Sequence, residues 1–456
     1  MAKGPREEVW AGAARRPNLA FAGLAVSGFA TLFLIGGAGV YTASAMSEFG
    51  TEHLLGPTFM VESLTRCLVL PLAAKLGGRI GRRPLFLAAL AGYLVATLAC
   101  GLAPSGLAFM AGRALAGLTW GLFEGNSFAL IADLFPADDA TRRTAYLQSV
   151  GLVALLVAAP AAGLLADNWT WRWVFWAALP LLAGAWGLVF VAIPRLAPTT
   201  SAPIDGGGVA ALAGVLIPLS VLLAWGGSAL PWVSPGTAAL IGAAAVCAAL
   251  LVRAERRAAD PIFPAYVLRH RSFMAVLALM GAFCAVSAAF NFLPAFAESI
   301  LDLSPAAAGF LNTPSLVVGA VGASMVGRRL AARGQYRGSV LGWGFALVAA
   351  SGMVFAFGAG TAVWFILAAT AVAGLAQACA QVLPFTYPMV ALRPDRVATG
   401  IAVTSFVGTL ASAFGNGLFT AVANTGLSNV FRGPIVLALI GLAAALCFRE
   451  RQARRA

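Results

Sequence analysis

Four charged residues interrupt the apolar stretches in the first half of this sequence: Glu62, Arg66, Arg113 and Glu124. An ionisable side chain inside a membrane is costly, so it faces a partner or a cavity and often marks a proton, ion or substrate path. A carboxyl group in a low-dielectric cavity can load and release a proton near neutral pH. These four residues therefore predict the chemistry of proton and cation exchange.

The spacing of the charges leaves two interpretations open. Glu62 and Arg66 are four residues apart, so they can pair on one helix face and lock helix packing, or they can form a proton or substrate site. Glu124 has no basic residue within a turn or two, which favours it over Glu62 as the proton carrier. We expect Arg113 to be needed for function but not for folding, with its partner among backbone carbonyls or polar groups of the first helix.

A cavity is predicted from polar and aromatic residues near these charges and in the second half of the chain. The apolar stretches of the second half carry polar groups such as Asn312, Gln377 and Asn416, and almost no charge apart from Glu298. Such residues commonly pack or bond between helices, so a packing role stays open for each. The predicted cavity residues are Trp120, Phe123, Asn126, Asn291, Gln381 and Tyr387.

The elements that must hold these residues are membrane helices. The chain has 456 residues, of which 60% are hydrophobic and only 10% charged. A soluble domain carries roughly 25% charged residues, and a helix needs about 20 apolar residues to cross a bilayer. Fourteen apolar stretches qualify, and they group as six, two and six: 19–46, 54–76, 85–102, 107–134, 146–165, 173–193, then 209–225 and 237–252, then 273–296, 306–326, 340–357, 362–390, 397–424 and 434–448.

The basic residues fix an even number of crossings. Lysine and arginine gather in cytoplasmic loops, and alternate loops of this chain hold nearly all of them when both termini are cytoplasmic. Omitting both weak central stretches preserves this separation, so twelve helices remain an alternative to fourteen. The net charge of +13 is thereby explained by orientation in a membrane, and a nucleic-acid partner is not expected.

Composition shifts divide the chain into five segments. We predict a cytoplasmic segment at 1–18, a six-helix bundle at 19–194, linkers with two additional helices at 195–271, a second six-helix bundle at 272–448 and a basic cytoplasmic tail at 449–456. A basic loop lies at the same place in each bundle, after its second helix, which predicts an internal repeat. The expected fold is an all-α membrane protein with two pseudo-twofold related bundles.

Several short motifs carry a family resemblance. The loop at 75–84 combines glycines with basic residues, and Gly117 and Gly121 give the fourth helix a small-residue face for close packing. Together with the segments 171–175 and 260–273, these motifs resemble the major facilitator superfamily, and the fourteen-helix form resembles its drug:proton antiporter branch. The resemblance implies a conformational role for the gating loop and helix ends at Lys75, Arg79, Gly81, Arg82, Arg83, Asp133, Pro160 and Gly163.

Three positions depart from that family pattern. Gly78 stands where the loop motif has an aspartate, Ala159 stands where the fifth-helix motif has a glycine, and the first helix lacks the acid usual in the antiporter branch. The resemblance thus implies the fold and two bundles rocking about a midplane cavity. It does not imply the usual proton site.

These observations predict a secondary active transporter that exports a small amphipathic molecule in exchange for protons. The alternatives are an uncoupled facilitator or importer of a small metabolite and, from another class, a membrane-embedded enzyme. We expect no cofactor and no metal, because the six cysteines and two histidines lack ligand spacing. The expected partners are the substrate, protons and the lipid bilayer, and the expected form is a multi-pass monomer in a bacterial inner membrane.

Overall fold

The computed structural model describes residues 16–194, 206–225, 230–231, 233–257, 270–392, 397–423 and 425–448, and its regular elements are helices. Hydrocarbon offers no hydrogen-bond partner, so a spanning segment must satisfy its own backbone, which a helix does. Within the described residues, twelve helices are long and apolar enough to cross a membrane. The all-α prediction is confirmed.

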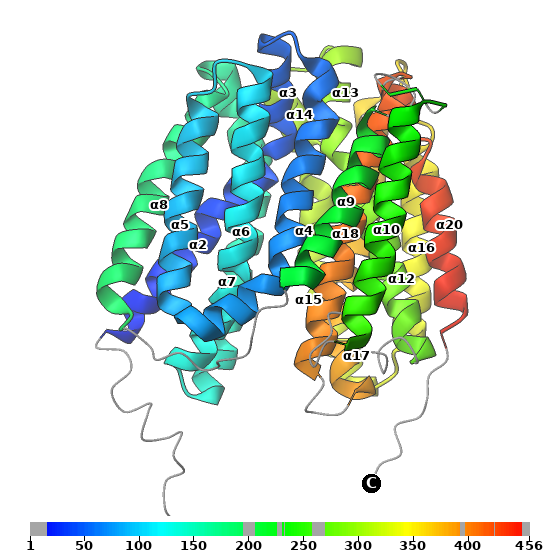
Figure 1. Cartoon of the computed structure of the whole chain (residues 1–456). Helices are drawn as coiled ribbons and strands as arrows, with labels where there is room; N and C mark the ends of the chain where they lie inside the picture. Colours follow the sequence, from blue (N-terminus) through cyan, green and yellow to red (C-terminus); the bar gives the residue numbers. More distant parts are fainter. Residues whose placement is uncertain are drawn as a thin grey trace, which may run out of the picture.

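The first bundle contains six crossings. The first is α2 (Pro17–Gly36) continued by α3 (Ala38–Glu48). It is followed by α4 (Leu55–Ile80), α5 (Arg82–Gly101), α6 (Gly106–Leu134), α7 (Ala137–Asn168) and α8 (Arg172–Ala192). Helix α6 packs on α4 and α5, while α2 packs on α7 and α8. Figure 1 shows these helices, in blue to green, side by side on the left of the molecule.

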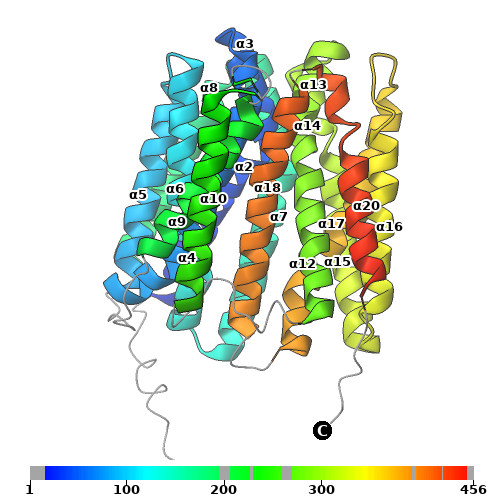
Figure 2. The same ribbon diagram turned by 45° about the vertical axis from the view of Figure 1, so that its right-hand side comes forward.

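Helices α9 (Gly206–Trp225) and α10 (Pro235–Arg257) form the additional pair. They pack against each other, and α9 also contacts α4 of the first bundle and α18 of the second. The pair therefore lies along the seam between the two bundles (Figure 2).

The second bundle repeats the first. Its crossings are α12 (Arg271–Ala289) continued by η2 (Phe290–Phe292) and α13 (Leu293–Ile300), α14 (Pro305–Phe310) continued by α15 (Thr313–Arg333), α16 (Arg337–Val354), α17 (Val363–Ala391), α18 (Val397–Ala423) and α19 (Leu427–Val430) continued by α20 (Pro434–Leu446). The α15–α17 contact repeats α4–α6, and α12–α18 repeats α2–α7. Across the seam, α18 meets α4 as α7 meets α14. These matched contacts are those of two bundles related by a pseudo-twofold axis.

Two predicted crossings fall outside the twelve, for different reasons. Helix α4 has 26 residues, about 39 Å of helix, but Glu62, Arg66, Lys75 and Arg79 lower its hydropathy. Helix α9 qualifies only as a shorter apolar helix over Ala210–Leu223. Both run alongside the other crossings (Figure 1), so the six-two-six grouping holds among the described helices.

The two faces of the molecule differ in charge. We call the face where α2 begins and α20 ends the terminal face, and the other the opposite face (Figure 1). The described helix ends at the terminal face include Arg16, Arg79, Arg82, Arg83, Arg142, Arg143, Arg253, Arg271, Arg328, Arg329 and Arg337, whereas Arg172 and Arg432 lie at the opposite face. The linker segments 195–205 and 258–269 and the tail 449–456 lie outside the described residues.

Candidate functional site

Two glycines bring α6 against α4 at the level of the charges. A Cβ atom at Gly117 would meet the backbone carbonyl of Glu62 and the hydroxyl of Thr65, and one at Gly121 would meet the backbone of Arg66. Small residues allow this approach between membrane helices. The predicted small-residue face thus lies on α6, the fourth crossing of the bundle. It packs on the part of α4 that carries Glu62 and Arg66.

The Arg113 guanidinium on α6 forms an ion pair with the Glu62 carboxylate on α4, and the arginine is only 1% exposed. The Tyr41 ring of the first crossing lies 5.3 Å from the guanidinium carbon. One of the two open interpretations is therefore excluded, and one prediction was wrong. Glu62 pairs between helices and not with Arg66 on its own helix face, and the partner of Arg113 is a carboxylate of the second crossing.

A second ion pair links the same two helices. Nε and Nη2 of Arg66 donate to the Glu124 carboxylate at 2.7–2.9 Å, and the guanidinium carbon lies 3.6 Å from the centre of the Trp120 ring. The Arg66 and Glu124 side chains are 22% and 32% exposed. Glu124 thus has a basic partner that is distant in sequence, and this pair is more accessible than the buried pair of Glu62 and Arg113.

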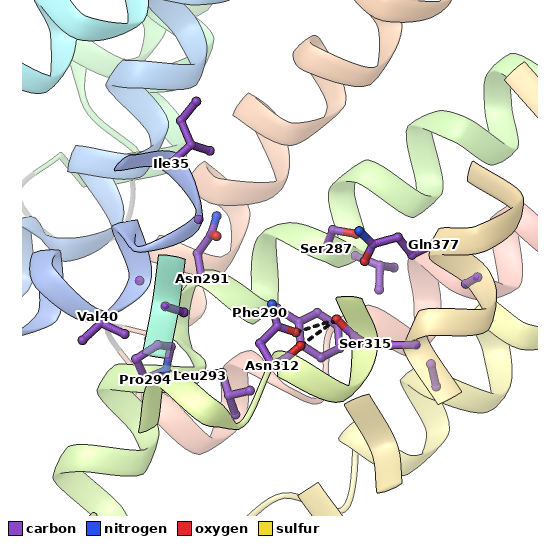
Figure 3. Close-up of a pocket in the computed structure, with 18 of the residues that line it drawn as sticks. Ile35, Val40, Ser287, Phe290, Asn291, Leu293, Pro294, Asn312, Ser315 and Gln377 are labelled. Atoms are coloured by element: carbon purple, nitrogen blue, oxygen red, sulfur yellow. Dashed lines mark hydrogen bonds between the residues drawn. The ribbon is translucent and has the colours of Figure 1, made fainter. Parts of the chain in front are cut away.

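A cavity of about 130 Å³ lies between the second bundle and the first crossing. Figure 3 shows Asn291, Asn312 and Gln377 around it, with Ile35 and Val40 of the first bundle on one side. Its polar lining is uncharged: amides and the hydroxyls of Ser287 and Ser315. Two hydrogen bonds link the bundles beside this cavity. Asn291 donates to Asn416 at 3.0 Å, and Asn416 donates to Ser63 of α4 at 3.2 Å.

The predicted cavity residues separate into different environments. Asn291 lines the cavity and Trp120 lies under Arg66. The other four are not among the residues that line the described cavities. Phe123 packs against Phe86 and Tyr93, Asn126 bonds to backbone carbonyls of Ala73 and Leu122, Tyr387 is buried among aromatic rings near the terminal face, and Gln381 is half-buried. The sequence did not single out Ser287 and Ser315, since isolated serines in an apolar helix carry no spacing signal.

The basic loop after α4 is held by contacts to helix ends. Gly81 connects α4 to α5 with φ of +94°, a conformation that favours glycine. Arg82 pairs with Asp133 of α6 at 2.7 Å, and Arg83 donates to the backbone carbonyl of Phe190 at 2.7 Å. Arg79 is exposed, and the side chain of Lys75 lies outside the described residues.

A sequence profile described as the Major Facilitator Superfamily matches residues 24–416. The chain belongs to this superfamily. The multidrug transporter protein MdtP of Bacillus subtilis is 26% identical over 258 residues, covering 56% of this chain and 47% of the relative, so the chain spans about half the length of that protein. The efflux pump mlcE of Penicillium citrinum is 25% identical over 406 residues, covering 84% of this chain and 73% of the pump.

Solved structures agree with the superfamily fold. The crystal structure of peptide transporter POT in complex with sulfate has a TM-score of 0.69 at 18% identity, covering 97% of this chain and 98% of that one. The human organic anion transporter MFSD10 (TETRAN) has a TM-score of 0.61 at 17% identity, covering 98% and 100%. Membership in this superfamily identifies a multi-pass membrane protein.

In this superfamily member, glycines bring the two bundles together near the opposite face. A Cβ atom at Gly163 of α7 would meet the backbone of Pro305 and Ala306, and one at Gly309 of α14 would meet the carbonyl of Ala159. The Asp167 carboxylate accepts a hydrogen bond from the backbone amide of Ala306 at 3.0 Å. Gly163 thus lies at a contact between bundles, while Pro160 lies inside α7.

Proposed function

We propose that this transporter exports a small amphipathic molecule in exchange for protons. The single observation that carries the proposal is the ion pair of Arg66 and Glu124, in which a partly exposed carboxylate lies between two membrane helices beside a cation. Proton and substrate then compete for one carboxylate, which produces exchange. The names of relatives, multidrug transporter and efflux pump, support the direction.

Alternating access is proposed as the transport cycle. The seam contacts of Gly163, Gly309 and Asp167 lie near the opposite face, and the ribbons of the two bundles stand further apart toward the terminal face (Figure 1). Rocking of one bundle against the other would open the opposite side and close the terminal side. The contacts of Arg82 and Arg83 at the terminal face would fix helix ends within the first bundle during this movement.

We further propose that the terminal face is cytoplasmic, in a bacterial inner membrane, and that the monomer is the transporting unit. The arginines gathered at that face support the orientation. Gly338 lies in the first turn of α16 at the terminal face, Gly360 lies beyond the other end of that helix at the opposite face, and both are exposed. In a cysteine-free background, Gly360→Cys should react with an impermeant thiol reagent on intact cells, and Gly338→Cys only after lysis. The reverse pattern would overturn the orientation.

Substrate-driven proton flux tests the exchange. Proteoliposomes with a pH indicator in the lumen and no initial pH gradient receive ethidium as the external probe. The proposal expects the lumen to become alkaline as ethidium enters, because protons leave in exchange. Entry of ethidium without a pH change would overturn proton coupling and favour the uncoupled facilitator.

A further inference from the structure

The position of Arg66 marks a site for a cation. Its guanidinium contacts two groups at once. The nitrogens lie 2.7–2.9 Å from the Glu124 carboxylate oxygens, and the guanidinium carbon lies 3.6 Å from the centre of the Trp120 ring. A carboxylate beside an aromatic face is the chemistry that recognises an organic cation. The Arg66 side chain therefore occupies a place that would fit a positively charged group from outside the chain.

This site faces the seam between the bundles. Ser63, three residues before Arg66 on α4, accepts a hydrogen bond from Asn416 of α18 at 3.2 Å, so this part of α4 lies at the contact with the second bundle. Glu124 keeps 32% of its side chain exposed, which is more than Arg66 keeps. The Glu124 carboxylate is therefore only partly covered by the protein.

Arg66 has a second carboxylate within reach. Glu62 lies one turn earlier on α4, and residues four apart on a helix are neighbours. One oxygen of Glu62 takes part in the pair with Arg113, while Oε1 is buried without a hydrogen-bond partner among the described residues. A buried acceptor without a partner is costly. Glu62 Oε1 is thus an acceptor that a displaced Arg66 can use.

We propose that Arg66 is a tethered cation that holds the substrate site of the empty transporter, and that the substrate is an organic cation which displaces it from Glu124 and Trp120 onto Glu62. The proposal rests on the exchange function above and names its substrate class. A proton on Glu124 displaces Arg66 in the same way. The proton-loaded and cation-loaded states then carry the same charge, so a one-for-one exchange is electroneutral.

A second group of the same composition provides a matched control. Arg172 pairs with Glu48 at 2.7 Å, and its guanidinium carbon lies 4.4 Å from the centre of the Trp171 ring. This group joins helix ends at the opposite face, between α3 and α8, away from the seam contacts of Arg66. Arg172→Gln therefore removes an arginine from a carboxylate and an indole without touching the proposed site.

Equilibrium binding of tetraphenylphosphonium tests the displacement. Purified protein in detergent is titrated at one mildly alkaline pH, with no proton gradient. Arg66→Gln should bind the probe at least about tenfold more tightly than the parent, since the tethered competitor is gone. Arg172→Gln should match the parent, and Glu124→Gln added to Arg66→Gln should abolish the gain. Unchanged or weaker binding by folded Arg66→Gln, including no binding at all, would overturn the proposal.

The role of Glu62 is tested by a double-mutant cycle. Glu62→Gln should weaken probe binding when Arg66 is present, because the displaced guanidinium loses the negative charge that would hold it, and should have little effect in Arg66→Gln. An equal effect in both backgrounds would contradict the proposal. If Arg66→Gln does not fold, Arg66→Lys replaces it, with a smaller gain expected from the loss of the bidentate contact. Binding of tetraphenylphosphonium does not require proton flux, so these experiments test the displacement of Arg66 independently of proton coupling.

Discussion

Arg113 and Glu62 form a buried ion pair about two turns from the opposite-face ends of α6 and α4. The same two helices are joined again by Arg66 and Glu124. Each carboxylate in this part of the molecule therefore has a guanidinium partner on the neighbouring helix. The two pairs differ in accessibility, because the side chains of Arg113 and Glu62 are 2% and 10% exposed and those of Arg66 and Glu124 are 22% and 32% exposed.

The buried pair predicts an asymmetric effect on stability. Arg113→Met leaves the Glu62 carboxylate without its cation, and breaking a buried pair costs about 3–5 kcal/mol. Replacing both residues with methionine should recover most of this loss, although not transport. Thermal unfolding of the purified protein measures both effects. An Arg113→Met variant as stable as the parent would contradict the buried pair.

The close approach of α6 to α4 predicts a glycine requirement. Gly117→Ala places a methyl group against the backbone carbonyl of Glu62, and overpacking of this kind costs about 1–3 kcal/mol. Gly184→Ala is the control, because a Cβ atom there meets no atom within 4 Å. Its effect should be neutral or slightly stabilising. Equal melting temperatures for the two variants would show that Gly117 is not at a tight contact.

The helices could be predicted from the sequence, whereas the charge pairing could not. Apolar length and the alternation of basic loops determine where a chain crosses a bilayer, and both are local properties. The pairing depends on how α4 and α6 are rotated against each other, and the partners are 51 and 58 residues apart. The four-residue spacing of Glu62 and Arg66 allowed a local pair, but Gly117 and Gly121 let α6 approach α4 closely, and both residues pair with α6 instead.

The contact between the two bundles near the opposite face predicts a position at which a disulfide would stop transport. Gly56 of α4 lies against the Thr420 side chain of α18, so the two bundles touch there. In a cysteine-free background, oxidation of Gly56→Cys/Thr420→Cys should form a disulfide and stop transport, and reduction should restore it. Gly184→Cys/Thr420→Cys controls for the oxidant. Full transport by a quantitatively cross-linked protein would exclude opening at this seam.

The ion pair of Glu48 with Arg172 predicts a change in folding stability that is confined to acidic pH. Burial raises the pKa of the Glu48 carboxyl, but hydrogen bonds from Arg172 and Trp171 outweigh it, so the pKa lies below its ordinary value. The ionised form is thus favoured by folding. Its contribution is complete above the ordinary pKa of about 4.3 and is lost as pH falls through the lower folded value.

Thermal unfolding of the parent and Glu48→Gln at neutral and strongly acidic pH checks this prediction. The gap in melting temperature should be small, because Glu48 is 45% exposed and solvent screens the pair. It should close as the pH falls. A gap that widens toward acidic pH would mean that folding raises the pKa of the Glu48 carboxyl, which contradicts the prediction.

The proposed exchange requires Glu124 to carry the exchanged proton. The most direct measurement is uphill ethidium accumulation in proteoliposomes with an acidic lumen, an alkaline medium and the membrane potential clamped at zero. We expect the parent to accumulate ethidium and a protonophore to abolish the accumulation. Glu124→Gln keeps the shape of the carboxyl group but cannot ionise, so it should show no accumulation. Downhill entry can survive in that variant. Uphill accumulation by Glu124→Gln at the parent's level would contradict the account, and its loss in Glu62→Gln alone would move the proton site to α4.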